Sequence, residues 1–414
     1  MMVSTYIRRI AMAAVTVCLL FSAGCGASPD RPSFSASDAN RDQIASANAF
    51  SLELGRRLLP GTAENRFFSP LSVSMAMGLV LNGAAGITRS EMLQTLEARG
   101  LSVHELNEGT RALTDVLEHQ DPEVTARIAN AAWVQRGIQP KETYAADLKT
   151  YYDAEIQAID FRDPDAPAVV NKWVDKHTKG MIPRLIESFP PDTVSALVNA
   201  IYFKGAWSEP FEKDQTRERP FHLADEKTAN VPMMEQSGSY PYKKEKAYEV
   251  LQLPYGEGKW RMTIVLPGDP GGLDALLPQL LSSPETWRGG LATAGGTVCI
   301  PRFSIKSTLR LEDTLRQLGM KTAFDPTKAD FSGMAEEGAL FYITQVVHQA
   351  RIEVDEDGTE AAAATAIAVD GGGEPGQPFE FTADRPFFFA IEEGETGAIV
   401  FLGAVRNPTA IAGS

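Results

Sequence analysis

The chain has 414 residues, of which 43% are hydrophobic and 22% charged, and its formal net charge is −15 at pH 7. The composition is typical of a globular protein, and the negative charge argues against a nucleic-acid partner and against docking on an anionic membrane through basic patches. Length alone favours two or three domains.

The N-terminus is typical of an export signal, over residues 1–24. Residues 6–9 are basic at their end, and the apolar run 10–23 is too short to span a bilayer comfortably. Cys25 follows Ser-Ala-Gly, which is similar to the bacterial lipobox, although Ser22 stands where that pattern usually has leucine. In that pattern the cysteine becomes the lipidated first residue. We expect an exported protein that is lipid-anchored to the cell envelope through Cys25, with an ordinary signal peptide and an extracellular product as the alternative.

Residues 25–40 are polar and rich in Ser, Asp, Ala and Pro, which predicts a flexible tether that carries the lipid. Beyond it we find no internal repeat and no second linker. Cys18 leaves with the signal, so Cys299 is the one cysteine left besides Cys25, in an apolar run where a buried, inert thiol is expected. The chain therefore has no disulfide framework despite its export, and a large core has to stabilise it.

The first half of the chain is rich in helical patterns. The segments with helical spacing or helix signals are residues 44–59, 69–83, 88 onward and 171–186. Ser69 before Pro70 is typical of a helix start. Thr88 and Glu91 predict a capping box for the third helix. The fourth is expected to be helical up to Gly180, with a second short segment after it.

The second half is rich in strand patterns, which are apolar or alternating runs bounded by turn residues. These runs are residues 194–203, 250–254, 261–267, 297–305, 341–355, 385–391 and 398–405. Helices first and strands later predict an α+β fold with large, mostly antiparallel sheets.

Catalytic motifs are missing from the sequence. It has no Gly-x-Ser-x-Gly elbow, no His-Glu-x-x-His and no Cys-x-x-Cys. The five histidines are scattered, at positions 104, 119, 177, 222 and 348. We therefore expect no catalytic residue, no metal and no cofactor, and a protein that is not an enzyme. A hydrolase whose site is assembled only in three dimensions is the least favoured class.

The most informative stretch is residues 356–365, Glu-Asp-Gly-Thr-Glu-Ala-Ala-Ala-Ala-Thr. It follows an alternating strand pattern over residues 351–355 and precedes a Gly-rich, Pro-containing tract over residues 370–378. Nothing in its Ala-rich part is too large or too charged to bury. The segment can therefore lie in solvent as a loop or enter a sheet as a strand, which is typical of a spring-loaded inhibitor.

Several short motifs, each weak alone, together resemble the serpin family over residues 44–408, and they occur in the serpin order. They are Asn65-Arg-Phe-Phe-Ser-Pro-Leu-Ser72, Asn82-Gly-Ala-Ala-Gly-Ile-Thr88, Asn171-Lys-Trp-Val174 with Thr178-Lys-Gly180, Leu197-Val-Asn-Ala-Ile-Tyr-Phe-Lys-Gly-Ala-Trp207, Val231-Pro-Met-Met234, Leu253-Pro-Tyr255, the segment from Glu356, and Ala383-Asp-Arg-Pro-Phe-Phe388. The resemblance implies a single domain over residues 41–410 with the serpin fold: three β-sheets, eight or nine helices and an exposed reactive-centre loop at about residues 356–382.

The resemblance also implies a function. Such a protein is a suicide inhibitor of serine proteases, with papain-like cysteine proteases as a further target class, and it traps the acyl-enzyme by inserting its cleaved loop into the main sheet. The alternative is a non-inhibitory serpin-like surface binding protein. The expected partner is a target protease of the elastase-like or subtilisin-like kind, with no nucleic acid, with membrane contact only through the N-terminal lipid, and with a monomeric chain.

The hinge that the resemblance assigns consists of Glu356, Gly358, Thr359, Glu360, Ala361, Ala362, Ala363, Ala364 and Thr365. Alternate side chains of a strand face opposite ways. If Thr359 faces the core, the other core-facing positions are Ala361, Ala363, Thr365 and Ile367, while Glu360 faces solvent. A charge on the core face would cost several kcal/mol.

The resemblance further assigns residues that act where the sheet opens: Ser69, Ser72, Asn199, Trp207, Arg302 and His348. Arg302 falls where the family often has a basic partner for Glu356. Ser69, Ser72, Asn199 and His348 match a buried polar cluster beneath the sheet.

The reactive bond is expected at Gly372–Gly373 by counting from the hinge. The loop is about three residues longer than is typical when counted back from Pro386, so the register stays open. Cleavage after Val369 or its neighbour would suit an elastase-like or subtilisin-like protease, and cleavage after Asp370 an Asp-specific one. Cleavage after Glu374 is disfavoured, since a proline follows.

Overall fold

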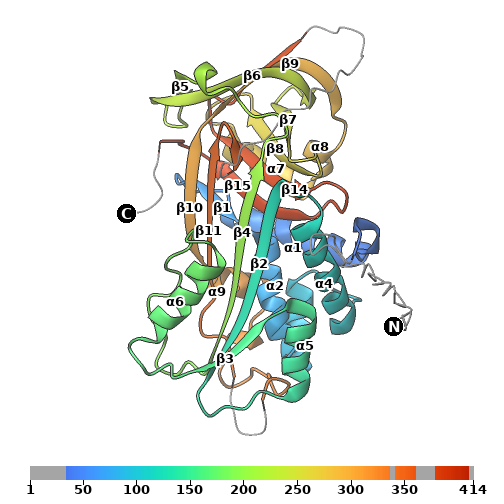
Figure 1. Cartoon of the computed structure of the whole chain (residues 1–414), viewed down its shortest axis with the longest axis vertical. Helices are drawn as coiled ribbons and strands as arrows, with labels where there is room; N and C mark the ends of the chain where they lie inside the picture. Colours follow the sequence, from blue (N-terminus) through green and yellow to red (C-terminus); the bar gives the residue numbers. More distant parts are fainter. Residues whose placement is uncertain (1–33, 336–340, 360–377, 410–414) are drawn as a thin grey trace, which may run out of the picture. The chain divides into compact units, whose positions relative to one another are not determined.

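The computed structural model describes residues 34–335, 341–359 and 378–409, all inside one compact unit, residues 32–414. Nine α-helices and two hydrogen-bonded sheets are present in these ranges (Figure 1). The α+β class predicted from the sequence is confirmed. No helix in the described ranges combines the length and apolar character that crossing a membrane requires.

The sheet that carries the hinge has six strands in the order β10-β11-β12-β4-β2-β3. Its strands are β2 (Val124–Gln135), β3 (Glu155–Ile159), β4 (Ser195–Ala206), β10 (Phe303–Arg310), β11 (Val347–Asp355) and β12 (Gly358–Thr359). All its pairs are antiparallel except β2 with β3. Figure 1 shows β11 and β4 as long strands that run beside one another.

The second sheet has nine strands, and the long β6 joins its two halves because it pairs with β7 in one half and with β5 and β9 in the other. Its strands are β1 (Arg66–Phe68), β5 (Arg217–His222), β6 (Thr228–Lys244), β7 (Tyr248–Tyr255), β8 (Trp260–Pro267), β9 (Ala292–Pro301), β13 (Phe379–Thr382), β14 (Phe387–Glu393) and β15 (Ile399–Val405). Three sheets were predicted, and the structure has two continuous hydrogen-bonded sheets, of which the nine-stranded one consists of two halves joined by β6.

The helices are α1 (Arg41–Leu58), α2 (Pro70–Leu81), α3 (Gly86–Thr95), α4 (Val103–His119), α5 (Glu142–Tyr152), α6 (Ala166–His177), α7 (Leu273–Ser282), α8 (Glu285–Arg288) and α9 (Glu312–Leu318). The start of α2 follows the sequence signal, since the Ser69 hydroxyl accepts the backbone N–H of Ser72 and Pro70 is the first helical residue.

The predicted capping box of α3 is wrong. The helix begins at Gly86 after Ala85, three residues earlier than a cap at Thr88 implies, and has no side-chain cap. Thr88 instead accepts the backbone N–H of Asp330 at 2.9 Å, and Glu91 accepts the backbone N–H of Lys321 at 2.8 Å. Both side chains therefore hold the α3 turn to a segment more than 200 residues away, which a local pattern does not reveal.

Other boundaries also differ from the prediction, and the strand expected over residues 341–355 begins, as β11, only at Val347. The run 297–305 is two strands in different sheets, β9 and β10, and the chain changes sheet at Arg302, whose side chain leaves toward the hinge. The helical prediction from residue 171 misses the first turn of α6, and the residues after Thr178 form no further helix. Asn171 explains the latter: its side chain accepts the N–H groups of Leu185 and Ile186, so that segment bonds to a side chain rather than to itself.

The folded unit also begins before the predicted boundary at residue 41. The backbone N–H of Phe34 donates to the Asp115 carboxylate of α4 at 2.8 Å, and Arg111 lies over the Phe34 ring. A short 3₁₀ turn, Ala36–Asp38, and the N-cap Asn40 then lead into α1. Residues 34–40 of the predicted tether are thus part of the fold.

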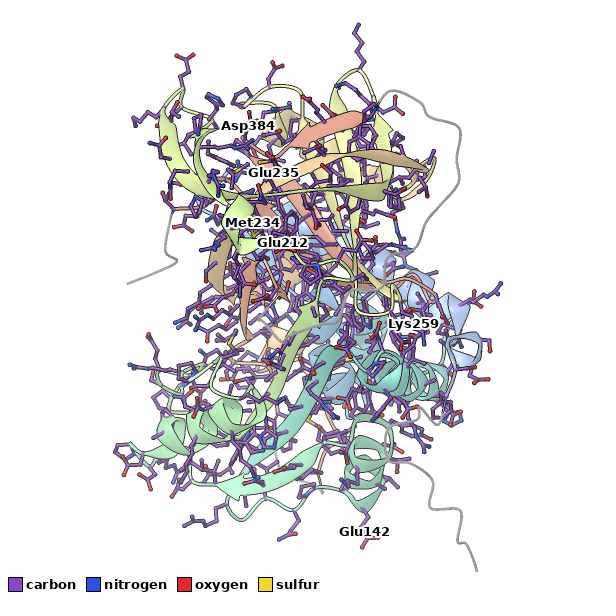
Figure 2. The ribbon with its side chains drawn as sticks, turned by 45° about the horizontal axis from the view of Figure 1, so that its top comes forward. Glu142, Glu212, Met234, Glu235, Lys259 and Asp384 are labelled. Atoms are coloured by element: carbon purple, nitrogen blue, oxygen red, sulfur yellow. The ribbon has the colours of Figure 1, made fainter. Side chains whose placement is uncertain are left out.

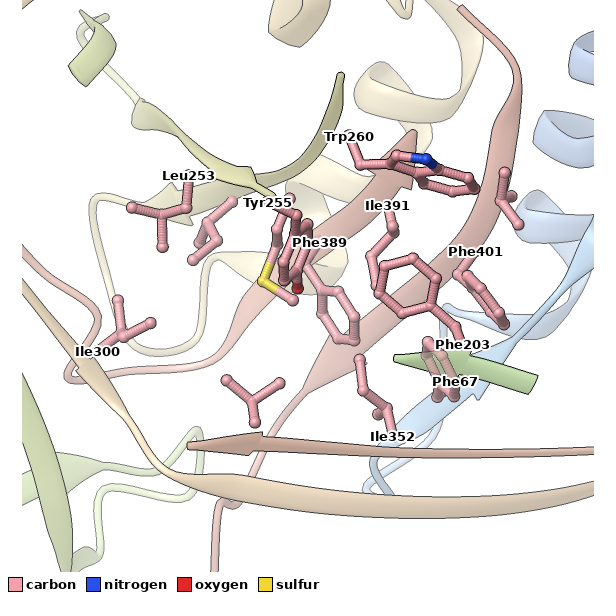
Figure 3. Packing of buried hydrophobic residues seen from close by; sticks show 14 of the residues in the cluster. Phe67, Phe203, Leu253, Tyr255, Trp260, Ile300, Ile352, Phe389, Ile391 and Phe401 are labelled. Atoms are coloured by element: carbon pink, nitrogen blue, oxygen red, sulfur yellow. The ribbon is translucent and has the colours of Figure 1, made fainter. Parts of the chain in front are cut away.

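Helices cover both faces of the hinge sheet. Val198 and Ala200 of β4 face α6 in one buried cluster. Ile201 and Phe203 face the opposite way and pack with Leu71 of α2 in another. Part of that second cluster is the set of rings around Phe203, Tyr255 and Trp260 in Figure 3. Strand β4 is therefore fixed between two packed layers, while its edge toward β11 is paired only at the hinge end.

Cys299, the one cysteine among the described residues, is buried, as the sequence predicts. Cys299 of β9 is 2% exposed, and burial raises the pKa of its thiol to about 11. Figure 2 shows Met234, Glu235 and Asp384 in the same region as β5 and β6, and Glu235 lies opposite Cys299 in the β6–β9 register. A protonated thiol in this strand is not a nucleophile at neutral pH.

Candidate functional site: the hinge and the slot between β4 and β11

The hinge enters the six-stranded sheet as the two-residue strand β12. Gly358 pairs with Asp355 of β11 on one side and with Ala206 of β4 on the other. Thr359 pairs with Val354 and Gly205 in the same way. The first residues of the predicted loop thus already lie between two long strands.

Gly358 is required by this geometry. Its φ is +140°, and a Cβ built on it would lie 2.2 Å from the carbonyl oxygen of Gly205. Only glycine adopts this conformation without strain and allows so close an approach of two backbones. The turn from β11 into β12 therefore depends on this residue.

Thr359 faces the core. It is 2% exposed, and its hydroxyl lies 2.8 Å from the hydroxyl of Tyr255, a residue of the ring cluster in Figure 3. The Tyr255 hydroxyl is fully buried, and burial raises its pKa, so it stays protonated and can share this hydrogen bond. This orientation is the one on which the predicted alternation of the following residues depends.

Glu356 is buried, with 1% of its surface exposed, and is held by charge. Arg302 donates to both of its carboxylate oxygens, with Nε at 2.7 and 2.8 Å, and the Thr216 hydroxyl donates to it as well. Burial raises the pKa of Glu356, but the hydrogen bonds from Arg302 and Thr216 outweigh it and leave the pKa below its ordinary value. The structure thus brings together two residues that are 54 positions apart in the chain.

Trp207 contacts the turn that leads from β11 into β12. Its indole N–H donates to the Asp355 carbonyl at 3.0 Å, and its backbone N–H donates to the Asp357 carbonyl at 3.1 Å. Its ring stacks on Tyr255 at 4.4 Å between centroids. The turn Asp355–Asp357 is therefore held by Trp207, the residue that directly follows β4. The exposed Lys213–Asp357 ion pair adds little to this.

Below β12, β4 and β11 form no recorded strand pair with each other in the described residues. Each is paired on its outer side along its length, with β2 and with β10. A cavity of about 80 Å³ lies there, lined by both strands and by α2. We call the region between β4 and β11 below Thr359 the slot, and the cavity occupies its far part, near Tyr342 and Thr193. Its two edges carry backbone donors and acceptors that an added strand can use.

A chain of buried polar groups crosses beneath the slot. His348 of β11 accepts the Ser69 N–H at 3.0 Å, and the Ser69 hydroxyl donates to the Val400 carbonyl at 2.7 Å. The Ser72 hydroxyl donates to Asn199 of β4, whose amide donates to Asn130 of β2 at 2.7 Å. The chain links both edges of the slot to α2, so parting of the edges has to rearrange it.

Within this row of buried polar groups, His348 is a neutral hydrogen-bond acceptor. The ring is 6% exposed, and burial lowers its pKa to about 4. At neutral pH, Nε2 is therefore unprotonated, which its hydrogen bond from the Ser69 N–H requires.

The structure places the predicted sheet-opening residues in two groups. Trp207 and Arg302 surround the turn at the hinge, and the polar chain contains Ser69, Ser72, Asn199 and His348. The predicted reactive bond, Gly372–Gly373 with its alternatives Val369 and Asp370, lies outside the described residues, as do hinge residues 360–365 and Cys25. The described residues contain no group of three or more potential metal-ligating side chains.

Sequence reasoning missed three side chains of the site: Tyr255, Thr216 and Asn130. Tyr255 belongs to a motif quoted above, so its motif was a usable signal, whereas its bond to Thr359 joins positions 104 residues apart. Thr216 and Asn130 lie in segments without any quoted motif. Their roles depend on tertiary contacts that no local spacing encodes.

Comparison with known proteins places this geometry in a family. Residues 45–408 match the family model described as "Serpin (serine protease inhibitor)". Leukocyte elastase inhibitor A from Mus musculus is 35% identical over 383 residues, which cover 89% of this chain and 100% of that protein. A serpin-like protein from Thermococcus kodakarensis is also 35% identical, over 88% of this chain and 85% of its own length.

Solved structures agree with the sequence comparisons. The thermophilic serpin tengpin in its native state is similar with a TM-score of 0.80 and 27% identity, covering 89% of this chain and 95% of its own. Human thyroxine-binding globulin is similar with a TM-score of 0.79 and 31% identity, covering 89% of this chain and 99% of its own.

Proposed function

Because the chain belongs to the serpin family, we propose that it inhibits serine proteases by inserting its cleaved loop as a strand between β4 and β11. One observation carries the proposal: the loop already starts as β12 inside the sheet, and the slot continues below it along two strand edges. Insertion is then an extension of existing pairing rather than a new docking event. Strand addition of this kind is a known use of a serpin sheet.

Energy supports the direction of the change. An inserted segment of about a dozen residues, at roughly 0.5–1.5 kcal/mol net for each hydrogen bond, gives on the order of 10 kcal/mol. The first core-facing residue, Thr359, is already buried and shares a hydrogen bond with Tyr255. The next core-facing positions of the sequence, Ala361 and Ala363, are smaller still, so they favour continued burial.

The direct experiment is incubation with a panel of serine proteases, followed by denaturing gel electrophoresis. We expect a covalent complex that survives boiling in detergent. If every protease cuts the loop and leaves unmodified, inhibition is contradicted. Mass spectrometry of the cleaved protein then identifies the bond, for which Gly372–Gly373, Val369 and Asp370 are the candidates.

The target class follows from the loop and from the relatives. Several relatives are named leukocyte elastase inhibitors, from Mus musculus and Bos taurus among others. The residues before Asp370 are small and apolar, which suits the pockets of elastase-like and subtilisin-like proteases. Papain-like cysteine proteases are a second target class for the same panel.

The alternative is a non-inhibitory binding protein with the same fold. The structural similarity to thyroxine-binding globulin, whose name states a binding role, keeps this alternative in view. A bulky or charged hinge would favour it. Here Thr359 is small and buried, and the next core-facing residues of the sequence are alanines. The observation that separates the two is whether the molecule becomes more stable after loop cleavage.

For localisation, we propose a monomer exported and held on the cell envelope by a lipid on Cys25. Several acyl chains on one cysteine would hold the protein firmly. Cys25→Ser is expected to release the protein from the membrane fraction into the medium. Unaltered membrane partition of this variant would contradict the lipid anchor.

A further inference from the structure

A second contact joins the two sides of the slot at the end far from the hinge. Tyr342 lies in the segment that leads into β11, and Asp192 in the segment that leads into β4. The Tyr342 hydroxyl donates to the Asp192 carboxylate. Tyr342 and Thr193, the neighbour of Asp192, both line the cavity of the slot. We call this contact the Tyr342–Asp192 bridge.

Each side of the bridge is attached to a different part of the fold. On the β11 side, the Ile343 N–H donates to Ala323 at 2.8 Å and the Val346 N–H donates to Glu312 at 2.9 Å. On the β4 side, the Val194 carbonyl accepts the N–H of Gln135 at 2.8 Å. Among the described residues, the bridge is the one recorded side-chain hydrogen bond between the two lead-in segments, 190–194 and 341–346.

The slot also contains a buried polar group without a hydrogen-bond partner near the bridge. Thr193 is 5% exposed, and its hydroxyl has no hydrogen-bond partner among the described residues. A buried hydroxyl without a partner carries a desolvation cost that a new backbone partner would relieve. The far end of the slot is thus suited to receive further backbone.

We propose that the Tyr342–Asp192 bridge restrains the far end of the slot and so sets how fast an inserting strand completes its path. An added strand lies about 4.8 Å from each neighbour, so the two edges have to part as it arrives. The bridge holds them together until its hydrogen bond breaks. This inference rests on the proposed function, and it concerns the rate of insertion rather than its occurrence.

The bridge joins an exposed carboxylate, Asp192, to a partly exposed phenol, Tyr342. The hydrogen bond to Asp192 raises the pKa of Tyr342, so the phenol remains a protonated donor at neutral pH. Exposed groups exchange readily with water. The bridge is therefore a contact that an advancing strand can break, rather than a permanent lock.

The test uses intact protein and a synthetic, N-acetylated peptide with the sequence of residues 359–368. Uptake of the peptide is followed through the rise in melting temperature with time. Tyr342→Phe is expected to take up the peptide about fivefold faster, which is the rate change that loss of one hydrogen bond allows. Tyr151→Phe is the matched control, since Tyr151 is a tyrosine of α5 that faces His104 away from the slot. It is expected to match the unaltered protein.

A second variant and a second measurement separate the bridge from general loosening. Asp192→Ala should speed uptake of the peptide as Tyr342→Phe does. The double variant should be no faster than either single variant, since both changes remove the same hydrogen bond. Amide hydrogen exchange over residues 341–346 should quicken in all three. Uptake by Tyr342→Phe at the unaltered rate, or additive effects in the double variant, would overturn the bridge while leaving loop insertion intact. No uptake by any variant would overturn the proposed function together with the bridge.

Discussion

At the residue scale, the hinge combines a buried charge with a buried hydroxyl. Glu356 is buried because Arg302 and Thr216 satisfy its oxygens, and Thr359 is buried because Tyr255 shares its hydrogen bond. The chain between them turns at Gly358. Each of these residues can be altered alone, and each alteration has a distinct expected result.

Arg302→Ala should leave the carboxylate of Glu356 buried without its cation. We expect the free energy of unfolding to fall by about 2–3 kcal/mol. This is less than for a fully enclosed ion pair, because the Arg302 side chain is 43% exposed. The pKa of Glu356 is lowered in the folded state, so the pair stabilises the fold above the unfolded pKa and this stabilisation is lost as pH falls through the folded value. The melting temperatures of the variant and the unaltered protein should therefore begin to converge as the pH falls below about 4.3, the ordinary pKa of a glutamate. A constant difference down to pH 3 would contradict this role of the pair.

His348 predicts a second pH dependence in a different range. Its pKa falls from 6.5 to about 4 on folding, so the unfolded chain binds more protons between these values and stability declines as the pH falls from 6.5 toward 4. At pH 5 the loss relative to pH 7 is about 2 kcal/mol. His348→Gln should remove this contribution, as seen in denaturation curves at both pH values. The same slope in the variant would show that other groups cause it.

Thr359→Arg should convert the inhibitor into a substrate. The core-facing position has no room or partner for a guanidinium, so insertion would stall at its first step. We expect the yield of protease complex to fall at least about tenfold while cleavage continues, as measured on denaturing gels. Thr228→Arg, at an exposed position of β6, is the control and should trap normally. Equal trapping by both variants would contradict insertion through Thr359.

At the element scale, β12 is the shortest strand of the six-stranded sheet and the one on which the proposed insertion depends. Its two residues pair on both sides, and the strand can grow along edges that are otherwise unpaired. The buried polar groups beneath the slot and the hydrogen bonds of Trp207 hold the neighbouring strands in place. Under the proposed insertion, β12 marks the boundary between the hinge and the part of the sheet that would open.

Gly358→Ala should expel β12 from the sheet. The new methyl would meet the Gly205 carbonyl, and the residue would have to keep a positive φ. Fluorescence of Trp207, which contacts the turn, should change, and stability should fall by more than about 1 kcal/mol. Gly295→Ala in β9 is the control, since nothing lies within 4 Å of its added methyl. Identical spectra for both variants would show that β12 is not seated as described.

Elements with strong local patterns were predictable from the sequence. The starts of α2 and the long runs of β7, β8 and β15 lie where the patterns place them, because capping and alternation are local. The capping box of α3 failed because Thr88 and Glu91 bond to distant segments. The prediction of one strand over residues 297–305 was wrong because an apolar pattern does not indicate that the chain changes sheet at Arg302. For the same reason, the contacts of Tyr255 and Thr216 required the structure.

At the scale of the whole molecule, the proposed insertion means that the intact fold is not the most stable arrangement of this chain. The six-stranded sheet has a slot in the middle with two unpaired edges, and the sequence that follows Thr359 is small enough to fill it. On the order of 10 kcal/mol is available from a dozen new strand residues. No disulfide has to open for this change, since the described residues hold one free, buried cysteine.

The most direct measurement is the melting temperature of the protein before and after its loop is cut by a small catalytic amount of subtilisin, with the cut confirmed by mass. The account predicts a rise of about 10–15 °C, because the gain of about 10 kcal/mol is spread over the unfolding entropy of some 370 residues. Amide exchange along β4 and β11 should slow at the same time. An unchanged or lower melting temperature, with both strand edges still exchanging, would contradict the account.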